Sequence, residues 1–285
     1  METVAIAGVG LIGGSFALAL RRAGFPGRIL GVSSAHTIEE ALALGAIDEG
    51  VSLEEAAARA DLLYLAQPVQ VIIDTLERLD PLVRPETLVT DAGSTKRRIV
   101  ETAARCLKRC LFIGGHPMAG KATRGVAVAE AGLFEGRTWV LTPLHPGDER
   151  QASVQTFAGW LDAIGAHLLW MDASEHDRVV AATSHLPQVA SSALAAVVGR
   201  RAETPASLAV AGPGLRDMTR LALSSYDLWR DILATNADLV GDTLDAYIAE
   251  LRAIRAGLDG EAARDTFAAG ERLARRLRGE RGASR

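Results

Sequence analysis

The stretch Val4-Ala5-Ile6-Ala7-Gly8-Val9-Gly10-Leu11-Ile12-Gly13 holds the strongest indication of the fold. Its first four residues form a short apolar run that is typical of a buried strand, and a helical pattern follows over residues 15–22. In the turn between them, Gly8 permits a tight bend, Gly10 lets phosphates approach the backbone, and Gly13 lets the helix pack closely against the strand. The helix N-terminus offers free N–H groups and a positive dipole end to an anion. The alternative is an ordinary glycine-rich turn, but this context predicts a dinucleotide site formed by Gly8, Gly10, Leu11, Ile12 and Gly13.

Outward from this turn, the first part of the chain alternates short apolar runs with helical patterns. Strands are predicted at residues 4–7, 28–32, 62–66, 88–90, 110–113, 138–141 and 166–171. Such alternation predicts a parallel sheet with helices on both faces. From Asp172 onward the strand signals stop, and helical patterns cover residues 175–199, 207–224, 226–257 and 261–278.

The predicted fold class is therefore α/β, with a Rossmann-type nucleotide-binding domain over residues 1–171 and an all-helical domain over residues 172–285. The helices of the second domain contain more alanine and leucine than a solvated surface requires. A helical domain of this kind often buries one face in a partner subunit, so we expect a homodimer formed through it.

The composition narrows the classes of partner. The chain has 285 residues, of which 48% are hydrophobic and 23% charged, as in a globular protein of two domains. A formal charge of −4 gives no electrostatic reason to bind nucleic acid. Cys106 and Cys110 have no His or Cys partners at metal-ligand spacing, so we expect reduced thiols and no metal site. Without a signal peptide or a membrane-spanning apolar run, the protein is expected to be cytoplasmic, with no membrane partner.

The residues after the second predicted strand bear on the choice of cofactor. This region reads Gly31-Val32-Ser33-Ser34-Ala35-His36, and the acidic residue that would bind a free ribose 2′-hydroxyl is absent. Ser33 and Ser34 are therefore the predicted cofactor residues at this strand end. The cofactor is NAD or NADP, and the missing negative charge favours NADP. Under the alternative interpretation, Ser33 hydrogen-bonds the ribose of NAD.

Two segments that follow predicted strands carry polar side chains suited to chemistry. Asp91-Ala92-Gly93-Ser94-Thr95-Lys96 follows the fourth strand, and Gly114-Gly115-His116-Pro117-Met118-Ala119-Gly120 follows the fifth. Ligands of open parallel sheets gather at this edge, where Ser94 can donate a hydrogen bond and Lys96 can hold an anion. Ser94 also precedes a helical run and can be a helix cap, and both roles can hold together. His116, in a rigid turn, can accept a proton or hold a hydroxyl group.

Two further segments lie in the predicted helical domain. Ser184-His185-Leu186-Pro187-Gln188 places His185 and Gln188 on one helix face beside a proline, which suits an exposed pocket lining or else a capped helix start. In Gly214-Leu215-Arg216-Asp217-Met218-Thr219-Arg220, the fork of Arg220 matches a carboxylate. The alternative is an ion pair between Asp217 and Arg220 within one helix, which Asp177 could join.

Taken together, these segments resemble the prephenate dehydrogenase family, which includes arogenate dehydrogenases. The resemblance runs from Val4 to Asn236 over five ordered motifs, and Trp229-Arg230-Asp231-Ile232 with Asn236 adds a sixth. It implies a nucleotide-binding domain followed by a helical dimerisation domain. It also implies NAD(P)-dependent oxidative decarboxylation of prephenate to 4-hydroxyphenylpyruvate in tyrosine biosynthesis, or of arogenate to tyrosine.

By the same resemblance, His116 is the catalytic histidine at the substrate ring hydroxyl, and Ser94 supports that hydroxyl and the nicotinamide. Arg220 pairs with a substrate carboxylate, His185 lines the pocket, and Asp177 and Asp217 steady the arginine by charge. The chain departs from the family at Lys121-Ala122, where members often have Thr-Glu, and at Gln188, where some carry a histidine. Both departures leave the choice between prephenate and arogenate open. Two other classes remain: a two-domain hydroxyacid dehydrogenase, and a protein that senses NAD(P) without catalysis.

Overall fold

The computed structural model describes residues 1–121, 123–202 and 204–279. These residues form two compact units, of which the first is Met1–Asn236 and the second begins at Ala237. The boundary near residue 171 that the sequence predicts lies inside the first unit and stays a prediction. All the candidate site residues named above belong to the first unit.

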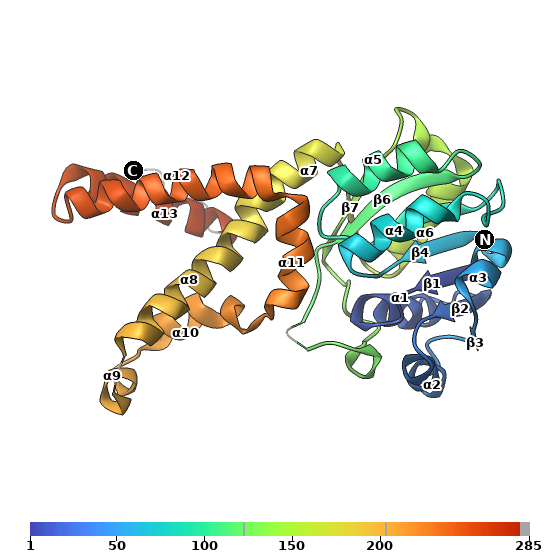
Figure 1. Ribbon diagram of the computed structural model, residues 1–285, viewed down its shortest axis with the longest axis horizontal. Helices are drawn as coiled ribbons and strands as arrows, with labels where there is room; N and C mark the ends of the chain where they lie inside the picture. Colours follow the sequence, from blue (N-terminus) through green and yellow to red (C-terminus); the bar gives the residue numbers. More distant parts are fainter. Residues whose placement is uncertain (122, 203, 280–285) are drawn as a thin grey trace. The chain divides into compact units, whose positions relative to one another are not determined.

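One mixed sheet organises the first unit (Figure 1). Its strands within the described residues are β1 Thr3–Ala7, β2 Arg28–Val32, β3 Glu49–Gly50, β4 Leu62–Leu65, β5 Leu88–Asp91, β6 Leu111–Pro117, β7 Thr138–Pro143 and β8 His167–Trp170. They lie in the order β3-β2-β1-β4-β5-β6-β7-β8. The chain moves outward from β1 to β3 and then crosses back to β4, so the order reverses between β1 and β4. Open α/β sheets bind their ligands at the carboxyl ends of the strands at such a switch point.

The predicted parallel sheet is confirmed for β1 to β6 and wrong for the last two strands. β7 runs antiparallel to β6, and β8 runs parallel to β7. A parallel neighbour needs a crossover that returns the chain to the starting edge, usually through a helix. The segment between β6 and β7 contains only a short 3₁₀ turn, η1 Val126–Val128, among its described residues, and the chain turns back at the same edge.

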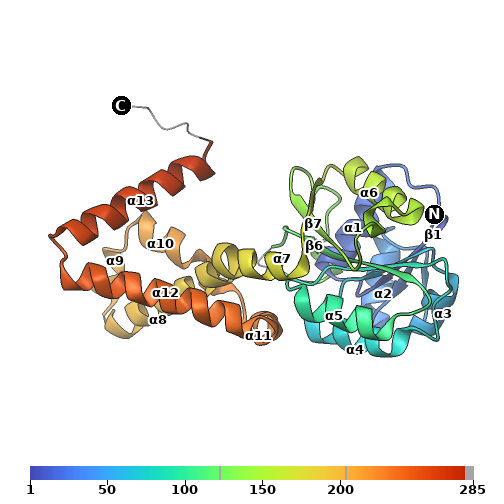
Figure 2. The ribbon, with the colours of Figure 1, turned by 90° about the horizontal axis from the view of Figure 1, so that it is seen from above.

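Helices cover both faces of the sheet. They are α1 Leu11–Arg22, α2 Ala35–Ala43, α3 Leu53–Arg59, α4 Val69–Leu79, α5 Arg97–Cys106 and α6 Ala152–Ala163, with a 3₁₀ turn η2 Asp148–Arg150. Figure 2 shows α1 and α6 on one side of the strands and α4 and α5 on the other. The helix α4 illustrates how the sequence produces this arrangement: its buried residues Val69, Ile72, Ile73, Leu76 and Leu79 recur at the spacing of one helix face.

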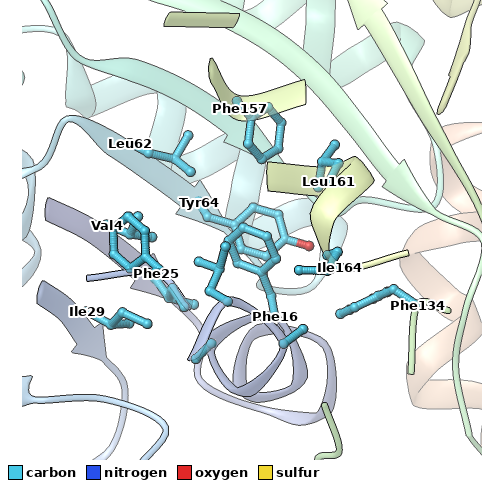
Figure 3. Close-up of a cluster of buried hydrophobic side chains, with 14 of the residues drawn as sticks. Val4, Phe16, Phe25, Ile29, Leu62, Tyr64, Phe134, Phe157, Leu161 and Ile164 are labelled. Atoms are coloured by element: carbon cyan, nitrogen blue, oxygen red, sulfur yellow. The ribbon is translucent and has the colours of Figure 1, made fainter. Parts of the chain in front are cut away.

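Two hydrophobic cores result, one on each face, because successive residues of a strand point to opposite sides. Val4 and Ile6 of β1 join the core under α1 and α6, whereas Ala5 and Ala7 join the core under α3, α4 and α5. The first core is rich in aromatic rings, and Figure 3 shows Phe16 beside Tyr64, with ring centroids 4.7 Å apart. Both cores anchor β1 and β4 from two sides, so the strand ends that carry the site have a rigid base.

Helices alone follow β8 in the described residues. They are α7 Ala173–Val180, the π-helical turn η3 Ala181–His185, α8 Leu186–Arg201, α9 Pro205–Ala209, α10 Pro213–Thr219, the 3₁₀ turn η4 Arg220–Leu223 and α11 Tyr226–Thr235. The second unit contains α12 Ala237–Ala256 and α13 Glu261–Leu277. In the described part of the chain, no helix combines the length and apolar character needed to span a membrane.

Three of the four long helices that the sequence predicts are interrupted. The predicted helix 175–199 passes through the π turn before Pro187, which has no N–H to donate and whose ring crowds the carbonyl four residues earlier. The predicted helix 207–224 is broken at Gly212-Pro213, and the predicted helix 226–257 is broken at Asn236. The predicted helix 261–278 is confirmed as α13.

Candidate active site

The glycine-rich turn has the geometry of a nucleotide site. Gly8 has a φ of +96°, and a Cβ there would lie 2.5 Å from the Ala66 carbonyl oxygen at the end of β4. A Cβ on Gly13 would lie 2.2 Å from the Gly8 carbonyl oxygen. A Cβ on Gly10 would meet no atom within 4 Å, so the space over this residue, at the start of α1, is open. Leu11, Ile12 and Gly13 form the first turn of α1, where amides lack helical acceptors, and the residues therefore fit a dinucleotide phosphate.

The two serines after β2 differ in what they can offer a cofactor. Val32, the last residue of β2, pairs with Ala7 of β1, which places both serines beside the glycine-rich turn. The Ser34 hydroxyl caps α2 by accepting from the Thr37 amide at 3.3 Å, and it donates to the Thr37 hydroxyl at 3.0 Å. Ser33 is exposed and makes no side-chain hydrogen bond to any other described residue. Ser33 is therefore the better placed of the two to meet a ribose.

Ser94 follows β5 at the same edge of the sheet, in a half-buried position. The alternative interpretation as a helix cap is wrong, because α5 begins at Arg97 and its N-cap residue, Lys96, makes no side-chain cap. Within the described residues, the Ser94 hydroxyl makes no hydrogen bond. It is therefore free to bind a ligand, and the role in binding and catalysis that the sequence predicts for Ser94 stays a prediction.

Lys96 is fully buried and does not have the role that the sequence predicts for it. Its ammonium group forms an ion pair with the Asp91 carboxylate and donates to the Gly115 carbonyl oxygen at 2.6 Å. Asp91 also accepts from the amides of Gly93 at 2.7 Å and Gly115 at 3.0 Å. The prediction that Lys96 holds a substrate anion is contradicted, because this ammonium group is enclosed and already paired. Lys96 instead ties the end of β5 to the end of β6.

His116 lies within β6, near its end, whereas the sequence predicts that it follows the strand. Its Nδ1 is 2.8 Å from Nε2 of His176, and Nδ1 of His176 is 2.8 Å from Oδ1 of Asp177. His116 is 8% exposed, and His176 and Asp177 are fully buried. Burial, together with the neighbouring His176, Lys96 and His185, lowers the pKa of His116 well below its usual range. His116 is therefore neutral at neutral pH, as a proton acceptor must be.

Asp177 anchors α7 to α5 and does not steady Arg220 as predicted. Its carboxylate accepts from the backbone amides of Lys96 at 2.6 Å and Arg97 at 3.0 Å, besides the bond from His176. Burial by itself raises the pKa of this carboxyl group, but the bonds from His176, Arg97 and Lys96 outweigh it, and the pKa is lowered. The side chain thus remains an anion that faces His176.

His185 belongs to the same buried cluster. The Asn236 side-chain amide donates to the His185 Nδ1 at 3.3 Å and to the Asp177 carbonyl oxygen at 2.8 Å, while Arg97 donates to the Asn236 Oδ1 at 3.1 Å. The His185 ring meets Trp229 edge to face, with centroids 5.8 Å apart. His185 is 1% exposed, so the expectation of an exposed side chain beside the proline is wrong.

Burial of His185 predicts how the stability of the protein depends on pH. Burial, with a smaller effect of His176, lowers the pKa of His185 from 6.5 to about 4. The unfolded chain therefore binds more protons between these two values, so the stabilisation is complete above about pH 6.5 and is lost as the pH falls towards 4. We expect His185 to account for roughly 3 kcal/mol of that loss. Urea unfolding of wild type and of His185→Gln across this pH range measures this contribution. If the free energy of unfolding fell equally with pH in both proteins, the prediction would be wrong.

Gln188 binds the backbone of the turn that begins at Arg220. Gln188 is buried, and its side-chain amide donates to the Leu221 carbonyl oxygen at 2.9 Å and to the Ser192 hydroxyl at 3.3 Å. Gln188 therefore holds the turn that begins at Arg220 against α8 and is not an exposed pocket residue. Arg220 and Asp217 are exposed, and neither forms an ion pair within the described residues, so their predicted pairing is absent.

The structure brings together residues that sequence reasoning treated separately. His116, Asp177 and His185 form one buried cluster, which His176 and Asn236 complete. His176 was missed as a candidate, although its position directly before Asp177 was the available signal. Lys121 donates to the Val128 carbonyl oxygen at 3.0 Å and pairs with Glu130, and Ala122 lies outside the described residues. No cluster of potential metal ligands occurs in the residues that the structure describes.

A nucleotide-binding turn and an acid–base cluster at one sheet edge, followed by helices, define the class of two-part nicotinamide-dependent oxidoreductases. The family model "Prephenate dehydrogenase, nucleotide-binding domain" matches residues 16–169, and "Prephenate dehydrogenase, dimerization domain" matches residues 172–273. The prephenate dehydrogenase of Bacillus subtilis is 38% identical over 93% of this chain and 72% of its own length. The chain therefore belongs to the prephenate dehydrogenase family.

Solved structures agree with this assignment. The prephenate dehydrogenase from A. aeolicus, in complex with hydroxyphenyl propionate and NAD+, is 32% identical, with a TM-score of 0.85 over 98% of both chains. The arogenate dehydrogenase of Synechocystis is 29% identical, with a TM-score of 0.76 over 98% of both chains. The fold class predicted from the sequence is thereby confirmed.

Proposed function

We propose that this chain catalyses the NAD(P)-dependent oxidative decarboxylation of prephenate to 4-hydroxyphenylpyruvate. The observation that carries the proposal is the neutral, almost buried His116, which lies at the same sheet edge as the glycine-rich turn because β1, β4, β5 and β6 are parallel. The chain also belongs to this family. Arogenate, which would yield tyrosine, is the second candidate, because an arogenate dehydrogenase has a similar fold over 98% of the chain. The two substrates differ in one side-chain group, which is a keto group in prephenate and an amino group in arogenate.

In the proposed reaction, the bound cofactor supplies the hydride acceptor. His116 takes the proton of the ring hydroxyl group as the ring carbon loses its hydride, and the ring carboxylate then leaves as carbon dioxide. The electron pair of the broken carbon–carbon bond makes the ring aromatic, and His116 returns its proton to the phenolate oxygen. Because aromatisation drives the reaction, the chain mainly has to orient the groups.

Three more residues have proposed roles in binding substrate. The free hydroxyl group of Ser94 supports the same ring hydroxyl. The guanidinium of Arg220, which is exposed and forms no ion pair among the described residues, suits a bidentate bond to a substrate carboxylate. His185 lines the inner wall of the site beside His116, a role that its contribution to the lowered pKa of His116 supports.

Steady-state turnover of the purified protein with prephenate and with arogenate, each with NAD and with NADP, tests the proposal. Turnover of one substrate identifies it. If the protein binds cofactor but shows no turnover with any of the four combinations of substrate and cofactor, the result would favour a protein that senses NAD(P) without catalysis. Activity on a small hydroxyacid with none on prephenate or arogenate would favour a hydroxyacid dehydrogenase.

For the cofactor, we propose that the site accepts NADP, because no carboxylate at the end of β2 repels a 2′-phosphate. Ser33→Asp would introduce that charge, and we expect it to lower kcat/KM for NADP relative to NAD by about tenfold or more. Ser33→Ala, which removes the hydroxyl group without adding charge, is the matched control. An unchanged ratio in Ser33→Asp would show that Ser33 does not face the 2′ position.

The chain is also proposed to form a homodimer through its helical part. Val210 and Leu223 in the first unit are 85% and 77% exposed, and Phe267 in the second unit is 75% exposed. Several large apolar side chains with such high exposure indicate a surface that another protein covers. The family model over residues 172–273 carries the description of a dimerization domain. Sedimentation equilibrium at micromolar concentration tests this, and a monomer would contradict it.

The two free cysteines support a reducing, cytoplasmic location, which cell fractionation tests.

A further inference from the structure

His116, His176 and Asp177 form a chain of three buried side chains that begins on β6 and ends on α7. The two links are each 2.8 Å long, and they join His116 Nδ1 to His176 Nε2 and His176 Nδ1 to Asp177 Oδ1. His176 and Asp177 are fully buried, so bulk solvent does not reach the link between them. The atom that carries the hydrogen in each link can therefore be determined by starting from Asp177.

The Asp177 end is unambiguous. This carboxylate accepts two backbone amides, from Lys96 and Arg97, and its pKa is lowered, so it is an anion that only accepts. The His176 Nδ1 must then carry a hydrogen and donate it to Asp177. Burial lowers the pKa of His176, although Asp177 opposes this, and the ring is neutral with a bare Nε2.

The second link follows from the first. A bare His176 Nε2 can only accept, so the His116 Nδ1 must carry the hydrogen that it donates to His176. A neutral His116 then has no hydrogen on Nε2, which is the one ring nitrogen left to take the proton of a substrate hydroxyl group. The reverse tautomer would place two bare nitrogens opposite each other at 2.8 Å, without a hydrogen bond.

We propose that His176, oriented by Asp177, is a positioning residue that holds His116 in the tautomer with a free lone pair on Nε2. The proposal rests on His116 being the base of the proposed reaction. The other charged groups around these three side chains do not replace His176 in this role. The Arg97 Nε lies 3.6 Å from the Asp177 Oδ2 and supports the anionic state of that carboxylate. Lys96 and Asp91 are paired with each other, and the Nδ1 of His185 is occupied by the Asn236 amide.

Nitrogen NMR of labelled histidine in the wild-type protein tests the tautomer without any substrate. The His116 signals are assigned by their absence in His116→Asn. We expect Nδ1 to report a bonded hydrogen and Nε2 to report none. A hydrogen on Nε2 of the neutral ring would overturn the proposal, whether or not the protein turns over prephenate or arogenate.

The matched variant is His176→Asn, whose amide can still donate to Asp177 but cannot reach His116. We expect the hydrogen of His116 to move to Nε2 and kcat to fall by about 10²-fold or more, with KM and cofactor binding close to wild type. A variant that keeps its kcat would overturn the proposal. A lowered kcat with the His116 tautomer unchanged would also overturn it, because it would indicate a merely structural role. If wild type turns over neither prephenate nor arogenate, the proposed function fails instead, and the wild-type NMR result stands on its own.

Discussion

Replacing His116 with asparagine is expected to lower kcat by about 10²- to 10⁴-fold, which is the usual contribution of a general base. Asparagine is close in size and keeps a polar group near the position of Nδ1, so the link to His176 can persist. What it lacks is a nitrogen that can take a proton. The glycine-rich turn lies between β1 and α1 and does not include His116, so the dissociation constant for NAD or NADP should stay close to wild type.

Steady-state kinetics and fluorescence titration of the cofactor measure the two quantities separately. The control is His167→Asn, which changes an exposed histidine on β8 and should leave kcat unchanged. Turnover of His116→Asn within about tenfold of wild type would be too small a loss for the base and would assign that role to another group.

The second large effect is expected from Lys96→Met, which should reduce the free energy of unfolding by about 3–5 kcal/mol. Methionine fills much of the same volume but leaves the fully buried Asp91 carboxylate without its cation and the Gly115 carbonyl oxygen without a donor. Breaking a buried ion pair from one side costs more than the pair contributes, because a charge remains in a medium that solvates it poorly.

Urea unfolding of single and double variants isolates this effect. Lys96→Met combined with Asp91→Asn removes both charges, and we expect the double variant to be more stable than Lys96→Met alone. Arg105→Met, which removes an exposed ion pair with Glu77, should cost less than about 1 kcal/mol. If Lys96→Met unfolded with a similarly small change, the Asp91–Lys96 pair would not hold the ends of β5 and β6.

Structural features that depend on a few consecutive residues could be predicted closely from the sequence. The Gly8 to Gly13 turn was predicted correctly, because a positive φ at Gly8 and a close approach at Gly13 are requirements of a few consecutive residues. The Rossmann-type class followed from alternating strands and helices, and α13 followed from helical periodicity. His116 and Ser94 could be placed at the sheet edge because parallel strands share the direction in which they end.

Side-chain partners could not be predicted in this way, since packing brings them together from distant positions. Lys96 looked like an anion-binding residue, but the fold encloses it beside Asp91, and a buried ammonium group needs that partner. His176 contacts His116 across 60 positions, a contact that no local pattern encodes. The antiparallel β7 likewise depends on which edge the chain returns to. Local rules for backbone conformation were thus readable in the sequence of this protein, whereas the protonation states and pairing of its buried polar groups depend on the tertiary contacts that remove them from water.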